Sequence, residues 1–227
     1  MRPLDVKLPL LRHGGGGNRA TAVTTGLTLH QATGMINAAA RSLDCSKPLT
    51  RHVTIRLERQ GIADANAVKA IGKFLTLLRN HVRKKLGGDI AYIWAREHGS
   101  IIGCHVHIVL HLPDGYSWQG HRMRRWIERI SDRPYKIGTI KTTRIGGTAR
   151  AHESNPAFYL ANLMSVIGYV VKGANPDAAA ILELDRVKGQ GRIIGKRCGW
   201  SQNIGNAGRG RKKYTARGAD TTLIRQA

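Results

Sequence analysis

The sequence predicts an α+β fold with a central antiparallel β-sheet and helices packed against one face of the sheet. Between residues 48 and 145, segments of strand and helix character follow one another as strand, helix, strand, strand, helix and a shorter possible strand. A turn signal separates the two adjacent strands, so we expect them to form an antiparallel hairpin. A chain of 227 residues with 41% hydrophobic residues can form one globular domain with its own core.

The first part of this region contains a strand, a long helix and a second strand. Residues 50–57 alternate between polar and apolar side chains, which predicts a strand. Residues 64–86 carry apolar side chains at helical spacing, with Asp64 as a possible N-cap and two glycines as the stop signal. Residues 90–97 are rich in β-branched and aromatic side chains, which predicts the next strand.

The chain is organised around the strand at residues 103–112, which carries histidines on one face. Side chains alternate along a strand, so His105 and His107 point to the same side, with Cα atoms roughly 6.5 to 7 Å apart. At this spacing two imidazole nitrogens can bind one divalent cation. The hairpin brings Glu97 close to the pair as a carboxylate ligand. Nitrogen and oxygen ligands together suit Mg²⁺ or Mn²⁺.

Two helices are predicted after the histidine strand, with the shorter strand at residues 137–145 between them. The second of these helices begins at Asn155-Pro156 and contains Tyr169. Tyr169 lies off the apolar stripe of this helix, so we expect a nucleophile rather than a core tyrosine. Lys172 follows one turn later on the same face and is expected to stabilise the phenolate or hold a phosphate. The alternative for Lys172 is an ordinary solvated lysine.

The motifs fall within a predicted core of residues 48–175, flanked by two other segments. Residues 1–47 form an N-terminal arm with a run of four glycines and a short helix at residues 30–43. Residues 176–227 form a basic, glycine-rich C-terminal extension. Basic side chains on the helix at residues 117–130 and in the extension are expected to contact DNA, with a merely solvated charged face as the alternative. The residues expected to bind DNA are Arg122, Arg124, Arg125, Arg129, Lys196, Arg197, Arg209, Arg211, Lys212 and Lys213.

Charge and cysteine content limit the class of protein. The chain has 37 Lys and Arg against 14 Asp and Glu, a formal net charge of +23, which favours a polyanionic partner and nucleic acid first of all. The three cysteines form no Cys-x-x-Cys pair, so a zinc ribbon or disulfide framework is not expected and a reducing compartment fits. No stretch has the apolar length of a membrane span or signal peptide, and we expect a cytoplasmic protein.

The combined motifs resemble those of the HUH endonucleases, the single-strand nickases that initiate rolling-circle replication. The resemblance is carried by Glu97, by His105-Val106-His107 and by the pattern Tyr169-Val170-Val171-Lys172. It implies an RRM-like or ferredoxin-like HUH fold, a metal ion held by His105, His107 and Glu97, and Tyr169 as the nucleophile. The tyrosine follows the histidines and stands alone, which is similar to single-tyrosine replication initiators (Rep) rather than to relaxases.

The resemblance implies a metal-dependent nickase and strand transferase that forms a 5′-phosphotyrosyl DNA intermediate. Its expected cofactor is Mn²⁺ or Mg²⁺, and its expected substrate is single-stranded or hairpin origin DNA of a plasmid, phage or other mobile element in a bacterial cell. A separate helicase and polymerase are expected as partners, because the chain has no Gly-x-x-x-x-Gly-Lys-Ser/Thr motif.

Three alternatives remain at this stage. A single-strand DNA transposase would use the same chemistry. A non-catalytic, basic nucleic-acid-binding protein would use the sheet and the arms for binding, with the histidines facing water as in many half-buried strands. A two-histidine phosphoesterase would use His-x-Thr/Ser motifs without metal, and His52 with Thr54 would be one of them, but the second is missing because His107 follows His105 in that position.

Overall fold

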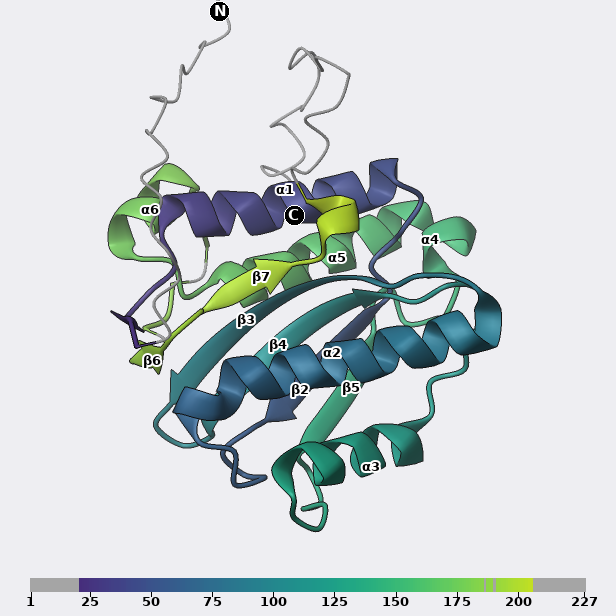
Figure 1. Cartoon of the computed structure of the whole chain (residues 1–227). Coiled ribbons are helices and arrows are strands. Elements are labelled where there is room, and N and C mark those ends of the chain that lie inside the picture. Colours follow the sequence, from purple (N-terminus) through teal and green to yellow (C-terminus); the bar gives the residue numbers. More distant parts are fainter. Residues whose placement is uncertain (1–20, 186, 190, 206–227) are drawn as a thin grey trace, which may run out of the picture.

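The computed structural model describes residues 21–185, 187–189 and 191–205 (Figure 1). Its centre is a five-stranded sheet in the order β5-β2-β4-β3-β7, in which all neighbouring strands are antiparallel. The strands of this sheet are β2 (Arg51–Arg56), β3 (Ala91–Gly99), β4 (Gly103–His111), β5 (Ile140–Arg144) and β7 (Cys198–Trp200). The predicted α+β class and antiparallel sheet are confirmed.

Helices cover both faces of the sheet, whereas the sequence analysis expected them on one face only (Figure 1). The helices on one face are α1 (Leu29–Asp44), α5 (Pro156–Val171) and α6 (Pro176–Ile181), and those on the other are α2 (Asp64–Leu86) and α3 (Gly120–Ser131). The short helix α4 (Ala151–Ser154) precedes α5, β1 (Val23–Thr24) pairs with β6 (Ile193–Ile194), and a 3-10 turn spans Gln202–Ile204.

Alternation along β4 produces two separate hydrophobic cores. Val109 belongs to the core beneath α1 and α5, while Ile108 and Leu110 belong to the core beneath α2 and α3. Successive side chains of a strand point to opposite faces, so one strand serves both cores. His105 and His107 have the same parity as Val109, which places both histidines on the face that α5 covers.

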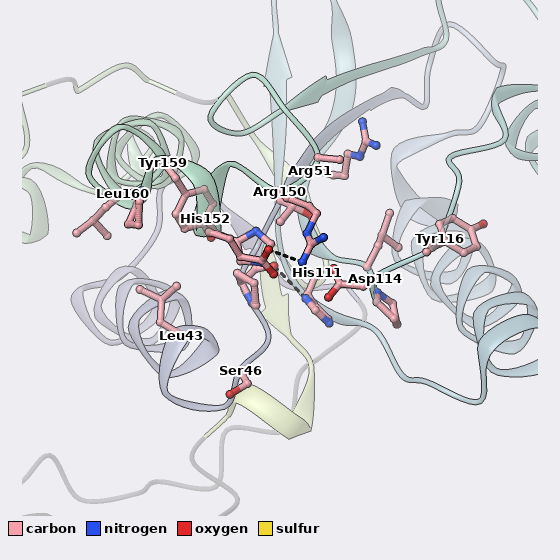
Figure 2. A pocket seen from close by; sticks show the side chains of 18 of the residues that line it. Leu43, Ser46, Arg51, His111, Asp114, Tyr116, Arg150, His152, Tyr159 and Leu160 are labelled. Carbon is pink, nitrogen blue, oxygen red and sulfur yellow. Dashed lines mark hydrogen bonds and ion pairs between the residues drawn. The ribbon is translucent and has the colours of Figure 1, made fainter.

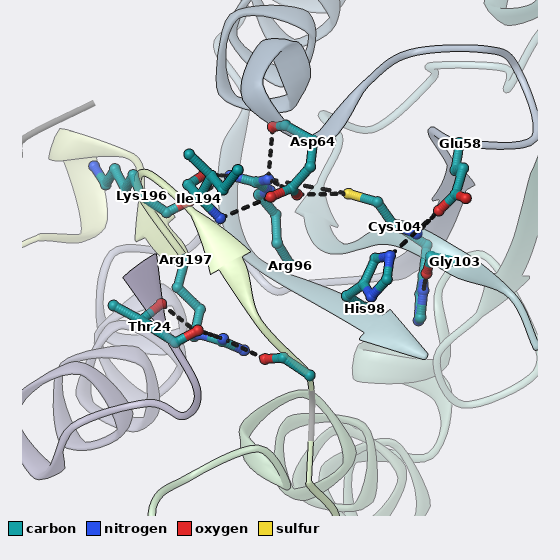
Figure 3. Close-up of polar contacts among 12 residues, drawn as sticks. Thr24, Glu58, Asp64, Arg96, His98, Gly103, Cys104, Ile194, Lys196 and Arg197 are labelled. Carbon is teal, nitrogen blue, oxygen red and sulfur yellow. Dashed lines mark hydrogen bonds and ion pairs between the residues drawn. The ribbon is translucent and has the colours of Figure 1, made fainter. Parts of the chain in front are cut away.

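Helix α2 has the predicted bounds, but Asp64 is not its cap. Ala63 is the N-cap, and Gly87 ends the helix with a left-handed backbone at φ 65°. The Asp64 carboxylate pairs instead with the buried guanidinium of Arg96 and accepts hydrogen bonds from the Cys104 thiol at 3.2 Å and the Ile194 N–H at 2.7 Å (Figure 3). Burial alone would raise the pKa of Asp64, but these contacts outweigh it and hold the pKa below its ordinary value.

Helix α5 begins as the sequence predicted. Asn155 is its N-cap and accepts a hydrogen bond from the Phe158 N–H at 3.2 Å, and Pro156 occupies the first turn, where a missing N–H costs nothing. Leu163, Ile167 and Val171 are buried, as the predicted stripe required. The end of α5 therefore lies over the histidine face of the sheet.

Segments outside the predicted core also pack against the sheet. Helix α1 contributes Met35 to the core beneath α5, and Trp200 of β7 lies so close to Gly34 of α1 that a side chain at residue 34 would overlap the indole ring. The division into arm, core and extension stays a prediction, because the glycine run and much of the extension lie outside the described residues. Within the described part of the chain, no helix is both long and apolar enough to cross a membrane.

Candidate metal and tyrosine site

The three predicted metal ligands lie together on one hairpin. Glu97 on β3 is directly opposite His105 on β4, and His107 is two residues further along the same face. The Nε2 atoms of His105 and His107 lie 3.2 and 3.5 Å from the two carboxylate oxygens of Glu97. All three side chains are buried, and one ligand atom of each lies within 4.8 Å of the others. The hairpin alone therefore assembles a possible metal-binding set.

The turn of this hairpin fixes the register of the ligands. Gly99 pairs with Gly103, and the turn between them is residues 100–102. Gly103 has φ 68°, and a side chain there would collide with Glu58, whose carboxylate accepts the Cys104 N–H at 2.8 Å. A glycine is thus required where the strand carrying the histidines begins.

Hydrogen bonds on the far side of each imidazole orient the ligand nitrogens. Nδ1 of His105 donates to the Gly103 carbonyl at 2.8 Å, which points its Nε2 at Glu97. Nδ1 of His107 lies 3.1 Å from the Thr54 hydroxyl and 3.1 Å from Nε2 of His52. Among the described residues, Nε2 of His107 has no hydrogen-bond partner. A buried nitrogen that faces a carboxylate without a donor between them fits a cation at that point, so the residues present fit a divalent metal ion.

The electrostatics favour the protonation states that metal binding requires. Burial alone would raise the pKa of Glu97, but its contacts with the two histidines and with Lys172 hold the pKa well below the ordinary range, so Glu97 is ionised. Burial lowers the pKa of His107 more than the neighbouring carboxylate raises it. Burial also lowers the pKa of His52 to about 4, so both imidazoles are neutral near pH 7.

The end of α5 places Lys172 and Tyr169 against the same cluster. The Lys172 ammonium donates to both oxygens of Glu97, at 2.7 and 2.9 Å, and lies 3.4 Å from the centre of the Tyr169 ring. The Tyr169 ring packs edge-on against His107, with ring centres 5.1 Å apart. The structure thus brings together all five residues that the sequence placed in the catalytic site.

A pocket of about 400 Å³ opens in front of Tyr169. Thr54 faces His107 across one side of β2 and Lys141 across the other, so these three side chains form a row across the sheet. The sequence analysis did not place four of the lining residues in this site, namely His52, Thr54, Arg56 and Lys141. Their alternation along the strands was readable, but the pairing of β2 with β4 and β5 was not.

The basic residues expected to bind DNA are dispersed. Arg124, Arg125 and Arg129 are exposed on α3, which covers the face of the sheet opposite to the histidines (Figure 1). Arg122, on the same helix, is half-buried and donates to the Gln119 side chain at 2.8 Å. Their contact with DNA stays a prediction, and it would take place away from the pocket at Tyr169.

The two basic residues predicted near β7 differ in exposure. Lys196 is exposed, with its ammonium 5.7 Å from the centre of a Trp94 ring. Arg197 is 1% exposed, and its guanidinium donates to the Thr24 hydroxyl at 3.0 Å and to the Gly191 carbonyl at 2.8 Å (Figure 3). A contact of Arg197 with DNA would require this network to open. The other four basic residues, Arg209, Arg211, Lys212 and Lys213, lie outside the described residues.

A larger pocket, of about 900 Å³, lies at the opposite ends of β2 and β4 (Figure 2). It contains a second group of side chains with metal-ligand chemistry, Asp114, His152 and Glu153. Two of the three are exposed, and Glu153 already pairs with Arg150 at 2.6 Å. The buried cluster around Glu97 is therefore the better candidate for a metal centre.

Comparison with known proteins places the chain in a family. The family model of the replication-associated protein ORF2 matches residues 50–172, which is more than half of the 227 residues. The matched range contains the hairpin ligands together with Tyr169 and Lys172. No curated protein and no solved structure matches the chain. The chain therefore belongs to the family of the replication-associated protein ORF2.

Proposed function

We propose that this protein is an HUH-type, single-tyrosine DNA endonuclease and strand transferase that initiates rolling-circle replication. The observation that carries the proposal is the contact between the ring of Tyr169 and that of His107, because it places a phenol beside a buried set of metal ligands. Membership in a replication-associated family supports the same assignment.

Glu97, His105 and His107 would hold the divalent metal ion, Mn²⁺ or Mg²⁺. When bound, such an ion polarises the scissile phosphate and neutralises charge that develops in the transition state. The remaining requirements fall to the protein. His52 and Thr54 hold the His107 ring in place from its Nδ1 side, and the pocket lined by Arg56 and Lys141 would receive the phosphates of the strand.

Tyr169 would act as the nucleophile. Its phenol oxygen attacks the scissile phosphorus, the bond between phosphorus and the 3′ oxygen breaks, and the phenolic proton ends on that oxygen. The products are a free 3′-hydroxyl and a 5′-phosphotyrosyl link. The link keeps the energy of the broken phosphodiester, so a 3′-hydroxyl can later attack it and rejoin a strand.

The proposed substrate is single-stranded or hairpin DNA at the origin of a plasmid, phage or other mobile element. A formal charge of +23 and the two basic residues in the pocket support a polyanionic substrate. The proposed partners are a separate helicase and polymerase, because nicking and joining leave unwinding and synthesis to other proteins.

Covalent capture of DNA tests the proposal. We expect incubation with labelled single-stranded oligonucleotides, including the protein's own origin, and Mn²⁺ to give a protein–DNA band that survives a denaturing gel. Tyr169→Phe and His105→Ala/His107→Ala should lose the band, and mass spectrometry should place the adduct on Tyr169. Tyr159→Phe is the matched control, because Tyr159 is a buried tyrosine of the same helix whose hydroxyl donates to the Leu49 carbonyl.

A negative result would also be informative. If the wild-type protein retards DNA on a native gel but gives no covalent band, the chain is a non-catalytic nucleic-acid-binding protein and the proposal fails. If Tyr169→Phe keeps the band, another residue is the nucleophile.

A further inference from the structure

The Glu97 carboxylate contacts an ammonium and two imidazoles at the same time. Lys172 Nζ lies 2.7 Å from Oε1, which also faces His107 at 3.5 Å, and 2.9 Å from Oε2, which also faces His105 at 3.2 Å. Both oxygens that a metal ion would use are therefore already bound to a positive charge. Lys172 is 6% exposed, so water does not weaken this pair appreciably.

We propose that Lys172 competes with the metal ion for Glu97, and that Lys172 must withdraw its ammonium from the carboxylate when the ion binds. This inference rests on the function proposed above. Without the ion, Lys172 neutralises Glu97 and keeps the ligands assembled in a buried site. With the ion, the same ammonium is free to turn toward Tyr169 and the phosphate in front of it.

The surroundings of Lys172 allow the side chain to move while the backbone stays in place. Its carbonyl accepts the Lys188 N–H at 2.9 Å, and the next carbonyl, that of Gly173, accepts the Leu27 N–H at 2.7 Å. The ammonium already lies 3.4 Å from the centre of the Tyr169 ring, whose electron-rich face attracts cations. A short rotation of the flexible lysine stem can thus exchange the carboxylate for the region around the tyrosine.

The competition lowers the apparent affinity for the metal by the fraction of molecules in which Glu97 is free. If the paired arrangement outnumbers the free one by about ten to one, the apparent dissociation constant is about tenfold larger than the intrinsic one. Removing the ammonium should therefore strengthen metal binding, although the same substitution would impair a residue that acts in catalysis.

Mn²⁺ binding to the full chain, measured by titration calorimetry in the absence of DNA, tests the inference independently of activity. Lys172→Met should bind Mn²⁺ about tenfold more tightly than wild type or better. Lys172→Arg restores a cation able to pair with Glu97 and should bind about as weakly as wild type. Lys141→Met is the matched control for general charge removal, because Lys141 lines the same pocket but has no recorded contact with Glu97, and it should change the affinity by about twofold at most.

Equal or weaker Mn²⁺ binding by Lys172→Met would overturn the competition, as would a gain of the same size in Lys141→Met. If Lys172→Met does not fold, the wild-type protein supplies the test through amine-reactive labelling of Lys172 read by mass spectrometry. Mn²⁺ should accelerate this labelling, and an unchanged rate would reject the inference. Failure of the wild type and every variant to bind Mn²⁺ would reject the proposed function together with the competition.

Discussion

The Asp64–Arg96 pair should be the most important ion pair for the stability of the described structure. Arg96 is 1% exposed, and its guanidinium donates to the Ile194 carbonyl at 2.8 Å and the Lys196 carbonyl at 3.1 Å while pairing with Asp64 (Figure 3). It therefore ties the start of α2 to β3 and to the segment that leads into β7. Asp64→Ala would leave this guanidinium buried without its counter-charge.

The expected cost of Asp64→Ala follows from the burial of the two partners. Removing one partner of a buried ion pair costs about 3 to 5 kcal/mol, because the remaining charge is not compensated. The Arg96 side chain is 0% exposed but that of Asp64 is 21% exposed, so we expect the lower end of this range, about 3 kcal/mol. For a domain of this size that corresponds to a fall in melting temperature of roughly 6 to 12 °C.

Urea unfolding followed by circular dichroism measures the effect. The matched control is Glu153→Ala, because Glu153 pairs with Arg150 on the surface, where such pairs contribute about 0 to 1 kcal/mol. A loss of less than about 1 kcal/mol for Asp64→Ala, or a loss equal to that of Glu153→Ala, would refute the reasoning. The Arg96 charge would then be compensated by the backbone carbonyls alone.

Three further predictions concern pH, the orientation of His107 and packing. Because the pKa of Asp64 is lower in the folded chain than its ordinary value of 3.8, the Asp64 contribution is present above that pH and lost as the pH falls below it; the urea midpoint should therefore fall more steeply for wild type than for Asp64→Asn between about pH 6 and about pH 2.5. Thr54→Val removes the hydroxyl 3.1 Å from Nδ1 of His107 and should weaken Mn²⁺ binding roughly 10- to 100-fold in titration calorimetry. Gly34→Ala should destabilise the protein by about 1 to 3 kcal/mol in thermal melting, because its methyl group would overlap the Trp200 ring.

Each of these three predictions has an outcome that contradicts it. Parallel pH profiles for wild type and Asp64→Asn would show that Asp64 has the same pKa in the folded and unfolded chains. Unchanged Mn²⁺ affinity in Thr54→Val would mean that His52 alone orients His107, for which Thr54→Ser is the conservative control. A Gly34→Ala melting temperature equal to that of wild type would mean that α1 and β7 can move apart at no cost, with Gly72→Ala as the control because a methyl there meets nothing within 4 Å.

The hairpin ligands could be predicted from the sequence because they depend on local order. The alternation around His105 and His107 fixes their common face, and a short turn places Glu97 opposite His105. Both facts depend on neighbours in the sequence. The hydrophobic spacing of α2 and the Asn155-Pro156 start of α5 are local in the same sense, and the structure reproduces them.

The rest of the site depends on contacts between distant segments. The pattern of residues 50–57 predicts a strand but not its partners, so the position of His52 and Thr54 beside His107 could not be derived. The contact between Lys172 and Glu97 requires the end of α5 to lie over β3, which helical periodicity does not specify. Helix α1 and β7 were assigned to flanking segments because neither carries a motif, although both pack against the sheet.

The hairpin turn also makes the distance along the chain between ligands a strict requirement. Antiparallel pairing alternates faces with every residue, so inserting or deleting one residue in the turn at 100–102 would shift the register of β4 relative to β3 by one position. Glu97 would then stand opposite a side chain that points into the core beneath α2, and the carboxylate would lose its histidines. Changes in length that most surface turns accept would therefore abolish metal binding here while leaving the number of residues in the sheet almost the same.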